Sequence, residues 1–149
     1  VLGDSLTKAA ESEPALIIDF ATLTGAARVA MGPQVPPFFC NREKPVSDVL
    51  AQGETQVDPI WRMPLWKPYY SLLSSPIADM KNAGGSFAGC ITAALFLQRF
   101  VKNRPWMHLD TYGWNPSNRA GHPKGGDMYG VRALYFWLKA GGLNSDLSK

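Results

Sequence analysis

The stretch Ile17-Ile18-Asp19-Phe20-Ala21-Thr22-Leu23-Thr24-Gly25-Ala26 changes character halfway along, from apolar residues to a small, hydroxyl-rich turn. The apolar run at residues 15–18 is short, partly β-branched and preceded by a proline, which predicts a buried strand of an α/β sheet. Gly25 can adopt a conformation forbidden to other residues, so residues 26–31 are predicted to open a helix. Ligands of open α/β sheets collect where strands end and helix N-termini expose unpaired N–H groups. This turn is therefore the first candidate for a ligand site, although the local pattern by itself favours an ordinary strand–turn–helix with Thr24 as a cap.

Hydrophobic spacing along the rest of the chain indicates alternating helices and strands. Helices are predicted over residues 2–11, 46–52, 91–101 and 130–140. The inward face of the last helix is expected to carry Val131, Leu134, Tyr135 and Leu138. Further strands are predicted near residues 38–40 and 106–112. Helices interleaved with at least three strands predict an α/β fold.

Composition narrows the class of protein. With 149 residues and 46% hydrophobic residues, the chain is expected to form one domain over residues 1–149. Its net charge of +3 comes from scattered Lys and Arg residues, which argues against a nucleic-acid partner. Cys40 and Cys90 lie far apart, so buried, reduced thiols are expected rather than a disulfide or a zinc site.

No segment approaches the run of about 18 apolar residues that a membrane helix needs, and no secretory signal is visible. We therefore expect no membrane partner and a cytoplasmic location. The chain begins with Val1 rather than methionine, apparently inside a helix, which suggests a fragment or a processed chain.

Two further patterns could carry chemistry. The glycine-rich loop at residues 82–89 precedes a predicted helix, but it has neither a Walker A nor a GxGxxG sequence, which argues against phosphate binding. His108 and Asp110 share one face of a predicted strand and could bind zinc or manganese. Two ligands do not make a metal site, so a structural role for this histidine is favoured.

Gly3-Asp4-Ser5-Leu6 spells the signature of the GDSL hydrolases, in which the serine is the nucleophile. Such a serine needs a histidine base within hydrogen-bond reach. That family places its serine after a full strand and pairs a late histidine with an aspartate three residues before it. Neither His108 nor His122 has that aspartate, so a GDSL-type serine esterase using Ser5 is the weaker enzyme hypothesis.

Five motifs taken together resemble the leucyl aminopeptidases of the M17 family, in the same order and with the same spacing. They are Asp19-Phe20-Ala21-Thr22-Leu23-Thr24-Gly25-Ala26, Trp61-Arg62-Met63-Pro64-Leu65, Ile77-Ala78-Asp79-Met80-Lys81-Asn82, the helix at residues 89–97 and Trp106-Met107-His108-Leu109-Asp110. The resemblance covers nearly the whole chain. It implies a three-layer αβα sandwich with a mixed sheet, like that of zinc peptidases, present here as the C-terminal part of the catalytic domain.

The resemblance also implies a division of labour within a complete enzyme. Two divalent ions, Mn or Zn, would activate the water that removes N-terminal residues from peptides, and their ligands would lie upstream of Val1. This chain would then contain no catalytic or metal-binding residue and would supply the wall of the substrate pocket. The residues that match substrate-binding positions are Thr22, Leu23, Thr24, Gly25, Asn82 and Tyr112.

Further expectations follow from the same resemblance. The complete enzyme would be a homohexamer, and the isolated chain would be inactive. Tyr112 stands where many members have a small residue, so the preferred side chain of the substrate is open. A non-catalytic binding or assembly homologue, which keeps the fold without the metals, is an alternative of a different class.

Overall fold

Strand β4 (Trp106–Asp110) lies at the centre of the fold, and all five of its residues are buried. The computed structural model describes residues 1–144 and 147. Strand β1 (Ile17–Ala21) pairs with β4 in parallel, and β2 (Pro37–Cys40) pairs with its other edge in the antiparallel sense. Strand β3 (Trp61–Arg62) runs parallel to β2, so the sheet has the order β1-β4-β2-β3. The predicted α/β fold with a mixed sheet is confirmed.

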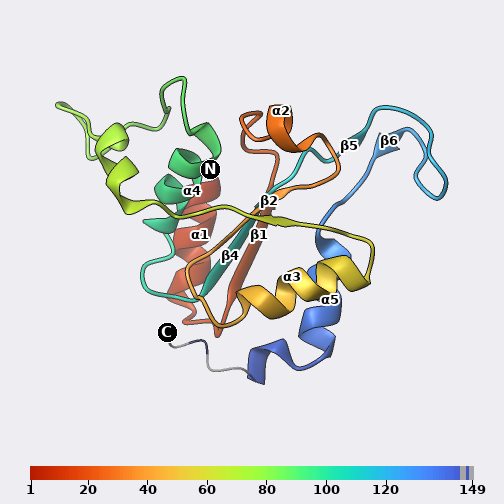
Figure 1. The fold of residues 1–149 in the computed structure, drawn as a ribbon. Coiled ribbons are helices and arrows are strands. Elements are labelled where there is room, and N and C mark those ends of the chain that lie inside the picture. The colour runs from red at the N-terminus through yellow and green to blue at the C-terminus, as the bar shows by residue number, and fades with distance from the viewer. Residues whose placement is uncertain (145–146, 148–149) are drawn as a thin grey trace.

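Helices cover both faces of this sheet, which gives the expected three layers (Figure 1). Helices α1 (Leu2–Glu11) and α4 (Gly89–Gln98) pack on one face. Helices α3 (Val46–Thr55) and α5 (Val131–Lys139) pack against each other on the opposite face. Each face therefore has its own hydrophobic core.

The two cores are separated by the alternation of side chains along the central strands. Phe38 belongs to the core under α3 and α5, whereas its neighbour Phe39 belongs to the core under α1 and α4. In β4, Met107 and Leu109 face the first of these cores and Trp106 faces the second. A strand that is apolar on both faces must be covered on both, so these sequences require helices above and below the sheet.

The predicted element bounds differ from the observed ones in several places: the helix predicted from residue 26 begins at Arg28, and the strand predicted over residues 106–112 ends at Asp110. Strand β1 begins at Ile17 rather than Ala15, because its ladder with β4 starts where the Ile17 N–H donates to the Pro105 carbonyl. Helix α3 continues through Gly53, where a Cβ would lie 3.1 Å from the Asp58 carbonyl oxygen, so this glycine permits close packing instead of ending the helix. Helix α4 begins earlier than predicted, at Gly89.

The predicted inward face of α5 is largely wrong. The buried residues are Ala133, Leu134 and Trp137, whereas Tyr135 is 55% exposed. The face buried in the core that α5 shares with α3 is therefore not the predicted one. The beginning of the helix is held by Asp58, which lies far away in sequence. Its carboxylate accepts hydrogen bonds from the backbone N–H groups of Gly130, Arg132 and Ala133 and so satisfies the first turn of the helix.

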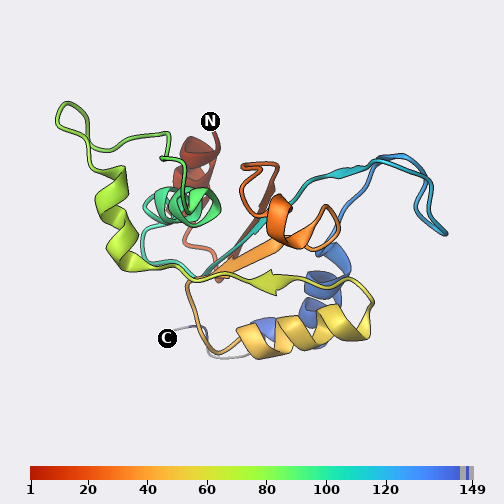
Figure 2. The ribbon, with the colours of Figure 1, turned by 45° about the horizontal axis from the view of Figure 1, so that its top comes forward.

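Short elements and two long excursions complete the chain. The short elements are α2 (Arg28–Met31), η1 (Lys67–Leu73), β5 (Trp114–Asn115), β6 (Gly125–Gly126) and η2 (Gly142–Asn144). Figure 2 shows the loop that follows η1 and the β5–β6 hairpin extending away from the sheet on opposite sides. Within the described residues, no helix has the length and apolar character required to cross a membrane.

A substitution at Gly130 can test how closely α5 is packed on the sheet. In Gly130→Ala, a Cβ would lie 2.2 Å from Leu109 Cδ2, at a backbone φ of +82°. We expect the free energy of unfolding to fall by about 3 kcal/mol in urea denaturation, since steric overlap adds to backbone strain. The matched control is Gly121→Ala, where φ is +74° but no atom lies within 4 Å of the added Cβ. It should cost only about 1 kcal/mol, and equal losses for both variants would contradict the packing argument.

Candidate functional site

The loop that follows β1 is held by Asp110, the last residue of β4. Asp110 Oδ1 accepts hydrogen bonds from the backbone N–H groups of Leu23 and Thr24, both at 3.0 Å. The Thr24 hydroxyl donates to Asp110 Oδ2 at 2.5 Å. These bonds form because the parallel register places Ala21 beside Asp110, so the two strands end together. The predicted turn is therefore pinned to the sheet by one buried carboxylate.

This arrangement leaves several backbone groups of the loop available, and two of them are spaced like the groups of a strand. Within residues 1–144 and 147, the Leu23 carbonyl accepts no hydrogen bond and the Gly25 N–H donates none. Both residues are exposed, with Leu23 at 37%. A carbonyl and an amide two residues apart on an immobilised loop can pair with an extended peptide backbone as a neighbouring strand would.

A cavity of about 480 Å³ lies beside this loop. Leu23 and Thr24 line it from the loop, and Asn82 lines it from the glycine-rich segment. Its other walls come from α1 and α4, including the apolar side chains Phe96 and Leu97. The structure thus brings together three of the predicted site residues from segments that are distant in sequence.

Two glycines allow the walls of this cavity to approach one another. A Cβ on Gly84 would lie 2.9 Å from Thr92 Oγ1, which ties the glycine-rich segment to α4. A Cβ on Gly89 would lie 3.1 Å from the Cβ of Ala26, so the beginning of α4 packs directly against the loop after β1. The glycine-rich segment therefore approaches α4 closely at Gly84, although its residues 82–87 are exposed.

Tyr112 lies in a second, much smaller hollow of about 10 Å³, which it shares with Thr24 and Asp110. The guanidinium of Arg28 lies over the Tyr112 ring, 3.8 Å from its centroid. Thr22 and Gly25 line neither hollow. The sequence did not single out Arg28, because nothing local links it to a tyrosine that lies far along the chain.

The acidic residues near the site form hydrogen bonds with different partners. Asp19 accepts hydrogen bonds from Trp106 Nε1 at 2.6 Å and lies 2.7 Å from His108 Nδ1. The His108 ring is also stacked on the rings of Trp106 and Phe39. His108 and Asp110 share one face of β4, but they have different partners: His108 bonds to Asp19, and Asp110 bonds to the loop. These contacts support a structural role for His108.

The donor set does not fit a metal centre. Among the residues described, no group of three or more His, Cys, Asp or Glu side chains could hold an ion. Asp110, which is buried, and Asp19, which is partly buried, already accept hydrogen bonds from protein N–H or O–H groups. No catalytic step through a metal can be derived from these side chains.

The site also lacks an activated nucleophile in the part of the chain described. Burial, and then the negative charge of Asp110, raise the pKa of the Cys90 thiol, so the reactive thiolate is disfavoured. Ser5 lies in α1, where its hydroxyl donates to the Val1 carbonyl at 3.2 Å. His122 Nδ1 is 2.8 Å from Asp127, on the segment that contains β5 and β6. The GDSL hypothesis requires a serine that follows a strand and a histidine base for that serine, and these contacts support neither.

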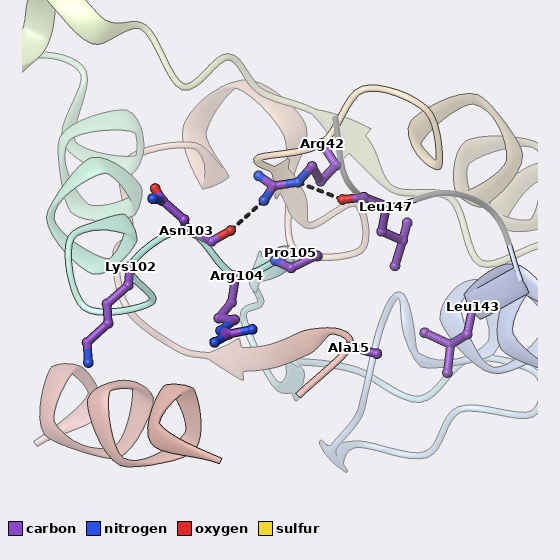
Figure 3. Close-up of a pocket in the computed structure, with 8 residues that line it drawn as sticks. All are labelled: Ala15, Arg42, Lys102, Asn103, Arg104, Pro105, Leu143 and Leu147. Atoms are coloured by element: carbon purple, nitrogen blue, oxygen red, sulfur yellow. Dashed lines mark hydrogen bonds between the residues drawn. The ribbon is translucent and has the colours of Figure 1, made fainter. Parts of the chain in front are cut away.

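A more open hollow of about 720 Å³ lies at the opposite end of β1 and β4 and gathers three basic residues (Figure 3). Arg42 donates to the carbonyls of Leu147 and Asn103, as the dashed lines show. Arg104 forms an ion pair with Glu13. Lys102 is the third basic residue of the lining. Two of the three cations are thus already bonded within the chain, and this hollow is separate from the candidate site.

Comparison with known proteins agrees with this architecture. The model of the cytosol aminopeptidase family, catalytic domain, matches residues 1–135. A probable cytosol aminopeptidase of Syntrophotalea carbinolica is 46% identical over 136 residues, which cover 90% of this chain and 27% of that protein. A probable cytosol aminopeptidase of Roseiflexus castenholzii is 46% identical over 147 residues, covering 94% of this chain and 30% of that protein.

Solved structures give the same result. The crystal structure of the Coxiella burnetii cytosol aminopeptidase superposes with a TM-score of 0.87 at 43% identity, covering 93% of this chain and 31% of that one. A mutant of tomato leucine aminopeptidase superposes with a TM-score of 0.80 at 38% identity, covering 92% and 27%. The chain thus spans under a third of the length of these relatives. By the extent of the family match, it belongs to the cytosol aminopeptidase family.

Proposed function

We propose that this chain is part of the catalytic domain of an aminopeptidase and forms the wall that holds the peptide substrate. The observation that carries the proposal is the loop at residues 22–25, which Asp110 immobilises beside the 480 Å³ cavity. Its free Leu23 carbonyl and Gly25 N–H offer one acceptor and one donor to a peptide. The family match over residues 1–135 supports the same assignment.

In this proposal, the loop binds the substrate through its backbone. The Leu23 carbonyl accepts a hydrogen bond from a substrate N–H, and the Gly25 N–H donates to a substrate carbonyl. Because Asp110 holds the loop before the substrate arrives, the loop loses little conformational entropy on binding. Leu23, Phe96 and Leu97 give the cavity apolar walls, which suit a leucine-like residue.

The hydrolytic chemistry is proposed to reside in a segment upstream of Val1. Two divalent ions, Mn or Zn, held there would supply the activated water, while the residues of this chain bind and orient the peptide. We propose further that the complete enzyme is a cytoplasmic homohexamer acting on peptides. Thr22, Thr24, Asn82 and Tyr112 complete the proposed substrate-binding set.

The first test compares this chain with the complete reading frame that encodes it. We expect the complete protein to hydrolyse leucine p-nitroanilide, to lose that activity in a chelator and to regain it with Mn. Purified residues 1–149 should show no hydrolysis under the same conditions and should retain no metal. Metal-dependent hydrolysis by residues 1–149 alone would overturn the division of labour. A complete protein that is inactive with every metal would favour a non-catalytic homologue instead.

The second test removes the anchor of the loop. In the complete enzyme, Asp110→Ala deletes the acceptor for the Leu23 and Thr24 N–H groups, and kcat/KM for leucine p-nitroanilide should fall about a hundredfold because the loop is displaced. Amide hydrogen exchange at Leu23 and Thr24 should accelerate about tenfold or more, as expected for the loss of hydrogen bonds to a charged group.

Asp127→Ala is the matched control for this substitution. It removes another partly buried carboxylate, which bonds to His122 away from the loop. Its activity and its exchange at residues 23 and 24 should remain near those of the unmodified enzyme. An Asp110→Ala enzyme with unchanged exchange at these two amides would show that Asp110 does not hold the loop.

A further inference from the structure

Arg28 is held beside the proposed substrate loop by an aromatic ring. It is the first residue of α2, and its guanidinium lies 3.8 Å from the centroid of the Tyr112 ring. A guanidinium stacked on an aromatic face has a restricted orientation, because the cation–π attraction favours one plane. One of its terminal nitrogens, Nη2, lies 3.9 Å from the point that a Cβ on Gly25 would occupy. Arg28 therefore lies close to Gly25, a residue of the proposed substrate loop.

The charge of Arg28 is not neutralised within the described residues. None of its guanidinium N–H groups donates a hydrogen bond there, although its backbone N–H donates to the Gly25 carbonyl, and no carboxylate forms an ion pair with its side chain. Two other arginines of the chain differ in this respect, since Arg62 pairs with Glu43 and Arg104 pairs with Glu13. Arg28 thus presents a pre-oriented fork of donors without an acceptor, and a carboxylate is the group that matches this fork best.

The surroundings determine on which side a carboxylate can bind. The hollow that the stacked pair lines encloses only about 10 Å³, and Pro33, Pro36 and Pro37 line it as well. That space is about the size of one water molecule, so it cannot admit a substrate side chain. Arg28 itself is exposed, and its solvent side is therefore open to a ligand.

We propose that Arg28, positioned by Tyr112, binds a carboxylate of the peptide substrate and so determines part of the specificity. This inference rests on the proposed function, because it assigns a substrate class to the same site. The carboxylate has two sources in small peptides: an acidic N-terminal side chain, or the terminal carboxylate of a dipeptide. In either case, a cation at this position disfavours substrates that bring a second positive charge to it.

The experiment uses the complete enzyme and two pairs of substrates that differ only in one negative charge. Glutamyl and glutaminyl p-nitroanilide test the side-chain source, and leucylglycine and leucylglycinamide test the terminal source. We expect kcat/KM to favour the charged member of one pair about tenfold, as for a charge-assisted hydrogen bond. In Arg28→Gln this preference should disappear, and in Arg28→Lys it should be partly retained, because lysine keeps the charge without the fork.

Arg99→Gln is the matched control, because Arg99 is also exposed and lies 5.9 Å from the centroid of the Tyr70 ring, outside both hollows. It should leave both substrate ratios unchanged. If Arg28→Gln hydrolyses leucine p-nitroanilide normally and keeps the same ratios, the inference is overturned while the proposed function stands. An equal loss with all substrates would also overturn it, since that indicates a general role. Absence of hydrolysis by the unmodified complete enzyme would instead refute the proposed function, and the inference with it.

Discussion

The carboxylate of Asp110 is the interaction on which the arrangement of the site depends. It joins the end of β4 to the loop after β1 through two backbone N–H groups and the Thr24 hydroxyl. These bonds require β1 and β4 to end at the same level, which the parallel register from Ile17 to Ala21 provides. That register in turn depends on two hydrophobic cores, one on each face of the sheet. The geometry of the site therefore depends on the packing of these two cores.

Buried carboxylates recur as connectors in this fold. Asp19 bonds to Trp106 and His108 across the β1–β4 pair, and Asp58 accepts the N–H groups at the beginning of α5. A buried carboxylate is stable only when its oxygens are hydrogen-bonded. Each of these acids therefore forces two separate segments into one relative position. Because their oxygens already accept these hydrogen bonds, the carboxylates do not provide a metal site among the described residues.

The proposed substrate wall and its positive charge come from different parts of the chain. The loop at residues 22–25 supplies backbone groups, the segment at residues 82–85 closes the cavity, and Arg28 with Tyr112 adds a positive charge at one edge. Thr24 lines both hollows, whereas Asn82 lines only the larger one and Tyr112 only the smaller one. In the function proposed here, the two hollows have distinct roles: one accepts the apolar part of the peptide, and the edge of the other recognises its charge.

The sequence by itself determined the elements whose signals are local, such as the strand at residues 38–40 and the helix at residues 2–11. Apolar runs and helical spacing are sufficient for these, and the order of five motifs was sufficient for the family. Only the tertiary structure decided that Asp58 holds the beginning of α5, that Asp110 holds the loop and that Arg28 stacks on Tyr112. These contacts join residues more than seventy positions apart, so no local pattern encodes them. They exist because folding the sheet brings the ends of separate segments to one place.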